Sequence, residues 1–166
     1  MTSIENDLAL IRGQEAAIVF ERFDEEQAFL LGVRLREHAV RDGLPIVIDV
    51  RTWDRALFFA ALPGSTEANA DWVRRKVNTV RRLGRSSYRA ALEQNTPDGL
   101  FPPRHGLDPK DFVLAGGSFP IRLAAAGIIG CVTISGLPQR QDHAVVVEAL
   151  CAHLGLDHAA LALPAE

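Results

Sequence analysis

Seven positively charged side chains lie between Arg74 and Arg89, a stretch of sixteen residues that contains no acidic residue. Guanidinium and ammonium groups bind carboxylates and phosphates, so this basic segment predicts a site for a small anion. Arg75 and Lys76 are the candidate ligand-binding residues, and the neighbouring Trp72 could close a pocket rim or a subunit contact. The alternative interpretation is a solvated helix face, or salt bridges to a neighbouring subunit.

Two consecutive glycines, Gly116 and Gly117, are the second candidate feature. A glycine pair lets a ligand approach the backbone closely, or lets backbone N–H groups point at an anion. The alternative is a tight corner beside a strand that needs a positive φ. The pair belongs to neither common phosphate-binding motif, because no Gly-Lys-Ser/Thr follows it and the GxGxxG spacing is absent.

Histidine is the remaining residue type with metal-binding or acid–base chemistry near neutral pH. His105 lies in a proline-rich segment, and His143 follows Asp142 near the start of the last long helix. Either imidazole could ligate a heme iron, and either could instead be a structural or surface residue. The sequence has no CxxCH, HExxH or GxSxG motif and no strong zinc spacing. We therefore predict no metal site and no catalytic residue, and the sequence favours a protein that is not an enzyme.

The composition limits the class of protein and its partners. A length of 166 residues with 48% hydrophobic side chains suits one domain, 1–166, with a substantial core. A net charge of −3 argues against nucleic acid. We expect no membrane span and no signal peptide, since the longest apolar run is far below ~20 residues and the N-terminus lacks a basic region. Cys131 and Cys151 are expected to be buried, reduced thiols of a cytoplasmic protein.

Helices and strands must position these candidates. Apolar spacing predicts helices over 2–13, 24–41, 68–84, 86–94 and 138–154. Short apolar runs predict strands at 16–20, 46–50, 56–62, 112–115, 121–125 and 128–134. The connections at 51–55 and 126–127 are too short for a crossover helix, so each must join an antiparallel hairpin. The pattern predicts an antiparallel sheet with flanking helices. We expect a core that includes Ile48, Phe58, Val132, Ile134, Val146 and Leu150.

Four segments together resemble one known family. They are GGSFPIR at 116–122, GIIGCVTISGLPQRQDH at 127–143, DWVRRK at 71–76 and the serine pair at 86–87. Each is weak alone, but in this order they resemble the GlcG/HbpS-like family, often called the heme-degrading domain family. The resemblance implies an α+β, profilin-like fold with a five-stranded antiparallel sheet and helices on both faces. It also implies homo-oligomers, and heme binding in some relatives.

Three functional hypotheses follow from the residues and the resemblance. The first is a homo-oligomeric, dimer-based protein that binds a small molecule, either heme or another anionic ligand. The second is a heme-degrading enzyme, which no catalytic constellation supports. The third is an assembly or interaction protein without catalytic activity. For the oligomer, we expect subunit contacts at Trp72 or at the proline-rich loop 95–111, whose apolar cluster at 100–103 would otherwise face water. The competing account is that Phe101 packs back into the core of its own chain and leaves a monomer.

Overall fold

The computed structural model describes residues 3–165. In chain order its elements are α1 (Ser3–Ala17), α2 (Glu25–Asp42), β1 (Val47–Thr52), β2 (Ala56–Ala61), α3 (Glu67–Leu83), α4 (Ser87–Gln94), the short 3-10 helix η1 (Pro103–His105), β3 (Ser118–Leu123), β4 (Gly127–Ser135), α5 (Gln139–Leu154) and α6 (His158–Leu161). All five predicted helices are confirmed, although α1 runs further than expected. The predicted start of that helix at Thr2 lies outside the described residues.

The sheet has four strands in the order β2-β1-β4-β3, and each neighbouring pair is antiparallel. Both predicted hairpins are confirmed, as β1 with β2 and β3 with β4. The expectation of five strands is wrong for the described residues. β3 also begins earlier than predicted, at Ser118, and it contains Pro120, which an outermost strand tolerates because its outer N–H groups need no partner.

Two predicted strands do not form, for two different reasons. At 16–20, α1 continues through Ala17, and the sheet is reached only at Phe20, by an isolated parallel bridge to Leu123. At 112–115, the backbone of Val113 finds its partner on a helix: the hydroxyl of Thr79 donates to the Val113 carbonyl at 2.8 Å and accepts from its N–H at 3.3 Å. A satisfied backbone has no need of a neighbouring strand.

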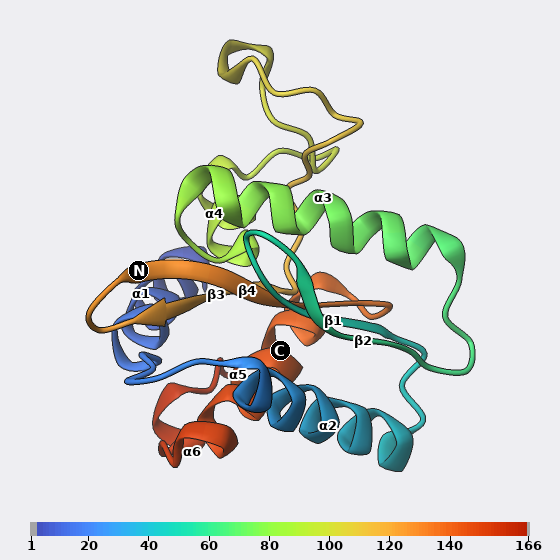
Figure 1. Ribbon diagram of the computed structural model, residues 1–166. Helices are drawn as coiled ribbons and strands as arrows, with labels where there is room; N and C mark the ends of the chain where they lie inside the picture. The colour runs from blue at the N-terminus through green and yellow to red at the C-terminus, as the bar shows by residue number, and fades with distance from the viewer. Residues whose placement is uncertain (1–2, 166) are drawn as a thin grey trace.

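Helices cover both faces of the sheet (Figure 1). α2 and α5 pack on one face, α3 packs on the other, and α1 and α4 lie towards the β3 edge. The predicted core is confirmed at Ile48, Val132, Ile134, Val146 and Leu150, whose side chains are all fully buried. Phe58 is only partly buried, because it lies on outermost strand β2 with its ring against Gly32 of α2.

The α3 face has a small apolar core of its own. Val73, Val77 and Val80 of α3 pack against Val47 and Cys131 of the sheet. Burial raises the pKa of the Cys131 thiol to about 11, so this thiol stays protonated in the folded chain. The valine stripe fixes α3 so that its first half crosses the sheet near the end of β4.

Most of the basic segment is neutralised within the same chain. Arg74 pairs with Asp71 and Asp111, while Arg89 pairs with Glu15 and Glu93. These partners come from the sequence on both sides of the basic segment, whereas Arg75, Arg81 and Arg82 are in no ion pair within the described residues.

The loop between α4 and β3 extends beyond α3 (Figure 1), yet it carries its own apolar cluster. Phe101 is only 8% exposed and packs against Ala90, Ala91 and Leu114. Of the two accounts of this loop, the structure agrees with the one in which Phe101 packs into its own chain, because α4 covers the ring. In the same cluster Leu100 and Pro102 are half-buried and Pro103 is exposed.

Candidate functional site

A buried ion pair joins the two helices on opposite faces of the sheet. The ammonium nitrogen Nζ of Lys76 on α3 donates to Asp142 Oδ2 at 2.9 Å and to the carbonyl of Ile134 at 3.0 Å. Both side chains are almost fully buried, at 3% and 1% exposure. Asp142 lies in the first turn of α5, and its other oxygen accepts from the N–H of Leu137 at 3.1 Å.

Burial acts on both members of this pair in the direction of their neutral forms. Loss of water lowers the pKa of Lys76, and the negative charge of Asp142 opposes that shift. Loss of water likewise raises the pKa of Asp142, against the positive charge of Lys76. The two pKa values are therefore drawn towards each other, and a proton can move along the 2.9 Å hydrogen bond at a reduced energetic cost.

The glycine pair makes room for this ion pair. Gly117 has φ of +121°, and a Cβ atom there would lie 2.8 Å from Nζ of Lys76 and 2.6 Å from the Ile134 carbonyl. A Cβ on Gly116 would lie 2.4 Å from the Gln139 carbonyl. The N–H of Gly116 already donates to the side chain of Gln139 at 3.2 Å. The close approach expected of the glycines is therefore made to Lys76 and α5 in this structure.

A cavity of about 340 Å³ opens beside the ion pair. We call it the Lys76 cleft, and it is lined by Asn69, Trp72, Lys76, Ala115, Ser135, Gly136, Leu137, Gln139 and Asp142. Asn69, Trp72 and Lys76 lie three and four positions apart on α3, so they share one face of that helix and form one wall of the cleft. Trp72 forms part of that wall and remains 39% exposed.

Arg75 is not among the residues that line the Lys76 cleft, but its guanidinium carbon lies 4.9 Å from the centre of the ring of Trp72, which is. Its Nε is buried and has no hydrogen-bond partner among the described residues. Beyond it lies an open hollow formed with Asp71, Arg74, Pro109 and Lys110. Unlike Arg74 and Arg89, Arg75 is in no ion pair within the described part of the chain.

The two histidine candidates lie elsewhere. His143 is fully buried, with its Nε2 2.8 Å from the side-chain oxygen of Gln14 and its ring between Tyr88 and Phe119. Burial lowers the pKa of His143 to about 3, so the ring is neutral near pH 7. His105 lies in the loop, where its Nε2 is 3.2 Å from Gln94. Neither lines the Lys76 cleft.

Of the predicted residues, Trp72 and Lys76 line the cleft, and Arg75 stacks on Trp72. Gly117 lies against Lys76, and Gly116 lies against Gln139. The cleft also contains polar residues that the sequence analysis did not select, namely Asp142, Asn69, Ser135 and Gln139. Asp142 was named there only as the neighbour of His143 near the start of a helix, and nothing in the sequence identified Lys76 as its partner.

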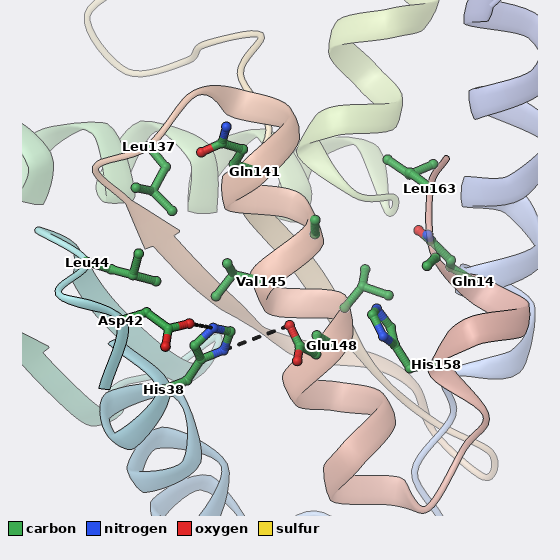
Figure 2. A pocket seen from close by; sticks show the side chains of 13 residues that line it. Gln14, His38, Asp42, Leu44, Leu137, Gln141, Val145, Glu148, His158 and Leu163 are labelled. Atoms are coloured by element: carbon green, nitrogen blue, oxygen red, sulfur yellow. Dashed lines mark ion pairs between the residues drawn. The ribbon is translucent and has the colours of Figure 1, made fainter. Parts of the chain in front are cut away.

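A second cavity of about 340 Å³ lies on the other side of α5 (Figure 2). We call it the His38 cleft. His38 of α2 lies between two carboxylates, with Nε2 2.9 Å from Asp42 and Nδ1 4.0 Å from Glu148 of α5. Leu44, Leu137, Val145 and Leu163 supply apolar walls, as Figure 2 shows, and no lysine or arginine is among its lining residues.

The described residues contain neither a metal-ion cluster nor a membrane-spanning helix. Within 3–165, no group of three histidine, cysteine or acidic side chains is placed to hold a metal ion. No helix in the same range is both long and apolar enough to cross a membrane.

A four-stranded antiparallel sheet with helices on both faces, and a cleft between α3 and the start of α5, defines a small α+β domain. A family model described as "Haem degrading protein HbpS-like" matches residues 23–151. The chain therefore belongs to the HbpS-like family, as the sequence motifs indicated.

Relatives of similar length extend this assignment over the whole chain. A UPF0303 protein of Mesorhizobium japonicum is 52% identical over 164 residues, which cover 99% of this chain and 98% of that protein. A UPF0303 protein of Acidobacterium capsulatum is 54% identical over 162 residues, with 98% of each chain covered.

Solved structures share the fold. The crystal structure of Ybr137w protein has a TM-score of 0.80 and 27% identity, with 89% of each chain covered. HbpS has a TM-score of 0.63 and 18% identity, over 81% of this chain and 91% of that chain. The PduOC:heme complex has a TM-score of 0.63 and 16% identity, over 82% of this chain and 97% of that chain. At these identities the last two support the fold alone.

Proposed function

We propose that this protein binds a small carboxylate-bearing molecule in the Lys76 cleft. The observation that carries the proposal is the hydrogen bonding of Lys76. An ammonium group has three N–H donors, and the described residues accept from two of them, at Asp142 and Ile134. The remaining donor belongs to a residue that lines a cavity of about 340 Å³, which is a volume typical of small-molecule sites.

The charge balance favours a ligand with one negative charge. Lys76 and Asp142 neutralise each other, whereas Arg75 contributes a cation without a carboxylate partner, stacked on the Trp72 ring. Trp72 offers the flat apolar surface against which the body of such a ligand can pack. The amides of Asn69 and Gln139 can orient its polar groups.

A matched pair of arginines tests this proposal. Titration with small monocarboxylates such as lactate, followed by tryptophan fluorescence, should show saturable binding. Arg75→Ala should weaken that binding about tenfold, the equivalent of about 1.4 kcal/mol. Arg81→Ala is the control, because Arg81 lies on the same helix but stacks on Trp53, a ring outside the cleft lining, whereas Arg75 stacks on Trp72, a ring within it. Equal losses in both variants, or no binding in the wild type, would contradict the proposal.

Heme is the second candidate ligand, because the family is described as haem degrading and one structural neighbour is a heme complex. Heme binding through protein residues needs an iron ligand and cations for the propionates. The lining of the Lys76 cleft holds a single cation, Lys76, which is already paired with Asp142, and no histidine. The His38 cleft has His38 and His158 but is lined by two carboxylates. Neither cleft of one chain therefore fits heme.

A heme titration followed by its Soret absorbance decides between these ligands. We expect no saturable band in the wild type and no difference in His105→Ala or His143→Ala. A saturable band that one of the two variants loses would make heme the ligand and place it outside both clefts.

We also propose self-association, supported by exposed apolar residues rather than by the loop. Phe59 on outermost strand β2 is 56% exposed, Phe29 on α2 is 52% exposed, and Trp72 is 39% exposed. Light scattering at micromolar concentration should give a mass above that of one chain, and a mass near 18.1 kDa would contradict this part.

A further inference from the structure

Lys76 is the one amine in the Lys76 cleft, and the sequence contains only one other lysine, Lys110. Lys110 lies on the exposed loop that follows η1, and it takes no part in an ion pair with a buried acid. The two lysines thus have the same side chain but different surroundings. One is exposed to water, whereas the other is buried beside a carboxyl group in the wall of a cavity.

The pair formed by Lys76 and Asp142 has the parts that imine formation requires. An amine attacks a carbonyl carbon only through a free lone pair, and the resulting hydroxyl group departs only after it accepts a proton. Burial favours the neutral amine on Lys76 and the protonated carboxyl group on Asp142. The distance of 2.9 Å between Nζ and Oδ2 places that proton donor beside the attacking nitrogen.

The space for a reacting carbon is the cavity of about 340 Å³ that Lys76 lines. It does not lie on the Gly117 side, where even a Cβ atom would be 2.8 Å from Nζ and 2.6 Å from the Ile134 carbonyl. Ala115, Leu137 and Trp72 give the cleft apolar walls that limit water around the nitrogen. Arg75 stacks on the Trp72 ring, 4.9 Å from its centre, and its guanidinium can hold a carboxylate on the same molecule.

We propose that Lys76 forms an imine with a small acid that also carries an aldehyde or ketone group. The inference assumes the proposed function, since the same cleft holds the carboxylate. The Lys76 nitrogen bonds to the carbonyl carbon, and the carbonyl oxygen takes the proton of Asp142. The nitrogen then returns one proton to Asp142. That proton passes to the hydroxyl group, which leaves as water. The product is a protonated imine paired with the Asp142 carboxylate.

Reduction of the imine with sodium cyanoborohydride tests this step. The full-length protein is incubated with pyruvate, reduced with sodium cyanoborohydride and mapped by peptide mass spectrometry. One reduced pyruvate should appear on the peptide that contains Lys76, at least about tenfold faster than on Lys110 or the N-terminal amine. Equal or faster labelling of Lys110 would overturn the proposal, and this comparison needs no variant that must fold.

Variants assign the roles. Lys76→Arg should abolish the fast labelling, whereas Lys110→Arg should leave it unchanged. Asp142→Asn should slow it by about 100-fold, the usual contribution of a general acid. Retention of fast labelling in Lys76→Arg, or an unchanged rate in Asp142→Asn, would contradict the assigned roles. Circular dichroism of each variant separates a lost reaction from a lost fold, and an unfolded variant leaves the wild-type comparison of the two lysines to decide.

Lactate separates this inference from the proposed function, since it keeps the carboxylate and lacks the carbonyl group. Binding of lactate without trapping of pyruvate would overturn the imine and leave carboxylate binding intact. Absence of both would overturn the two together.

Discussion

The Lys76 cleft and the His38 cleft have the same volume, about 340 Å³, and both are lined by Leu137, yet their charges are held in opposite ways. In the first, the charged pair is at most 3% exposed. In the second, the side chains of Asp42 and Glu148 are 43% and 49% exposed. Exposed ion pairs change the free energy of folding little, whereas burying a charge is strongly unfavourable unless the charge is fully paired. Cavity size therefore does not distinguish the two sites, but the solvation of their charges does.

The largest expected effect comes from breaking the buried pair. Lys76→Met leaves the carboxyl group of Asp142 buried without its cation, so the free energy of unfolding should fall by about 3–5 kcal/mol. The double variant Lys76→Met with Asp142→Leu should recover much of that loss, because no unpaired charge remains. Urea midpoints of the two variants and the wild type measure both effects. A single-variant loss below about 1 kcal/mol would mean that the pair is not desolvated.

An intermediate effect is expected at His143, which follows Asp142 but bonds to Gln14, a residue that lines the His38 cleft. The folded pKa of about 3 lies below the ordinary value of 6.5, so only the unfolded chain binds this proton between the two values. The stability from neutral His143 is complete above pH 6.5 and is lost as the pH falls towards 3. By pH 5 the loss should reach about 2 kcal/mol.

Denaturant midpoints near pH 8 and pH 5 measure this contribution. His143→Gln should remove most of the pH dependence in that window. His105→Gln is the control, because His105 lies in the loop and is only partly buried. An equal pH dependence in the wild type and in His143→Gln would show that other groups cause the loss.

The smallest effect is expected in the His38 cleft. His38→Gln and Glu148→Gln should each change the free energy of unfolding by less than about 1 kcal/mol, since exposed ion pairs are weak. Neither change should alter the affinity for lactate. A loss of lactate affinity in either variant would reverse the comparison and move the anion site to this side of α5.

The sequence predicted what depends on local spacing. The hairpins follow from connections that are too short for a helix, and the buried face of α3 follows from valines at helical intervals. The predicted strand at 112–115 does not form, because the partner of Val113 is a hydroxyl group 34 residues away, on Thr79. Strand propensity describes the segment itself, and it says nothing of which group will satisfy its backbone.

The candidate site likewise combines residues that the local sequence predicts with contacts that it does not. Trp72, Arg75 and Lys76 were found because they lie close together in one basic segment. The pairing of Lys76 with Asp142 spans 66 residues and depends on how the middle of α3 and the first turn of α5 are placed relative to the sheet. The burial of His143 depends on Gln14 of α1, which is 129 residues away. Contacts of this kind are set by tertiary packing, and no local pattern encodes them.

Cys131 offers a natural sensor of motion at the Lys76 cleft. Its thiol lies under the valines of α3, and burial keeps it in the unreactive protonated form. A thiol reagent can modify it only when α3 lifts from the sheet or the whole domain unfolds. The same helix carries Lys76. The alkylation rate of Cys131 therefore reports how often α3 moves away from the sheet and lets water reach the Lys76 cleft from below. A ligand that bridges α3 and α5 would slow that chemistry without touching the sulfur.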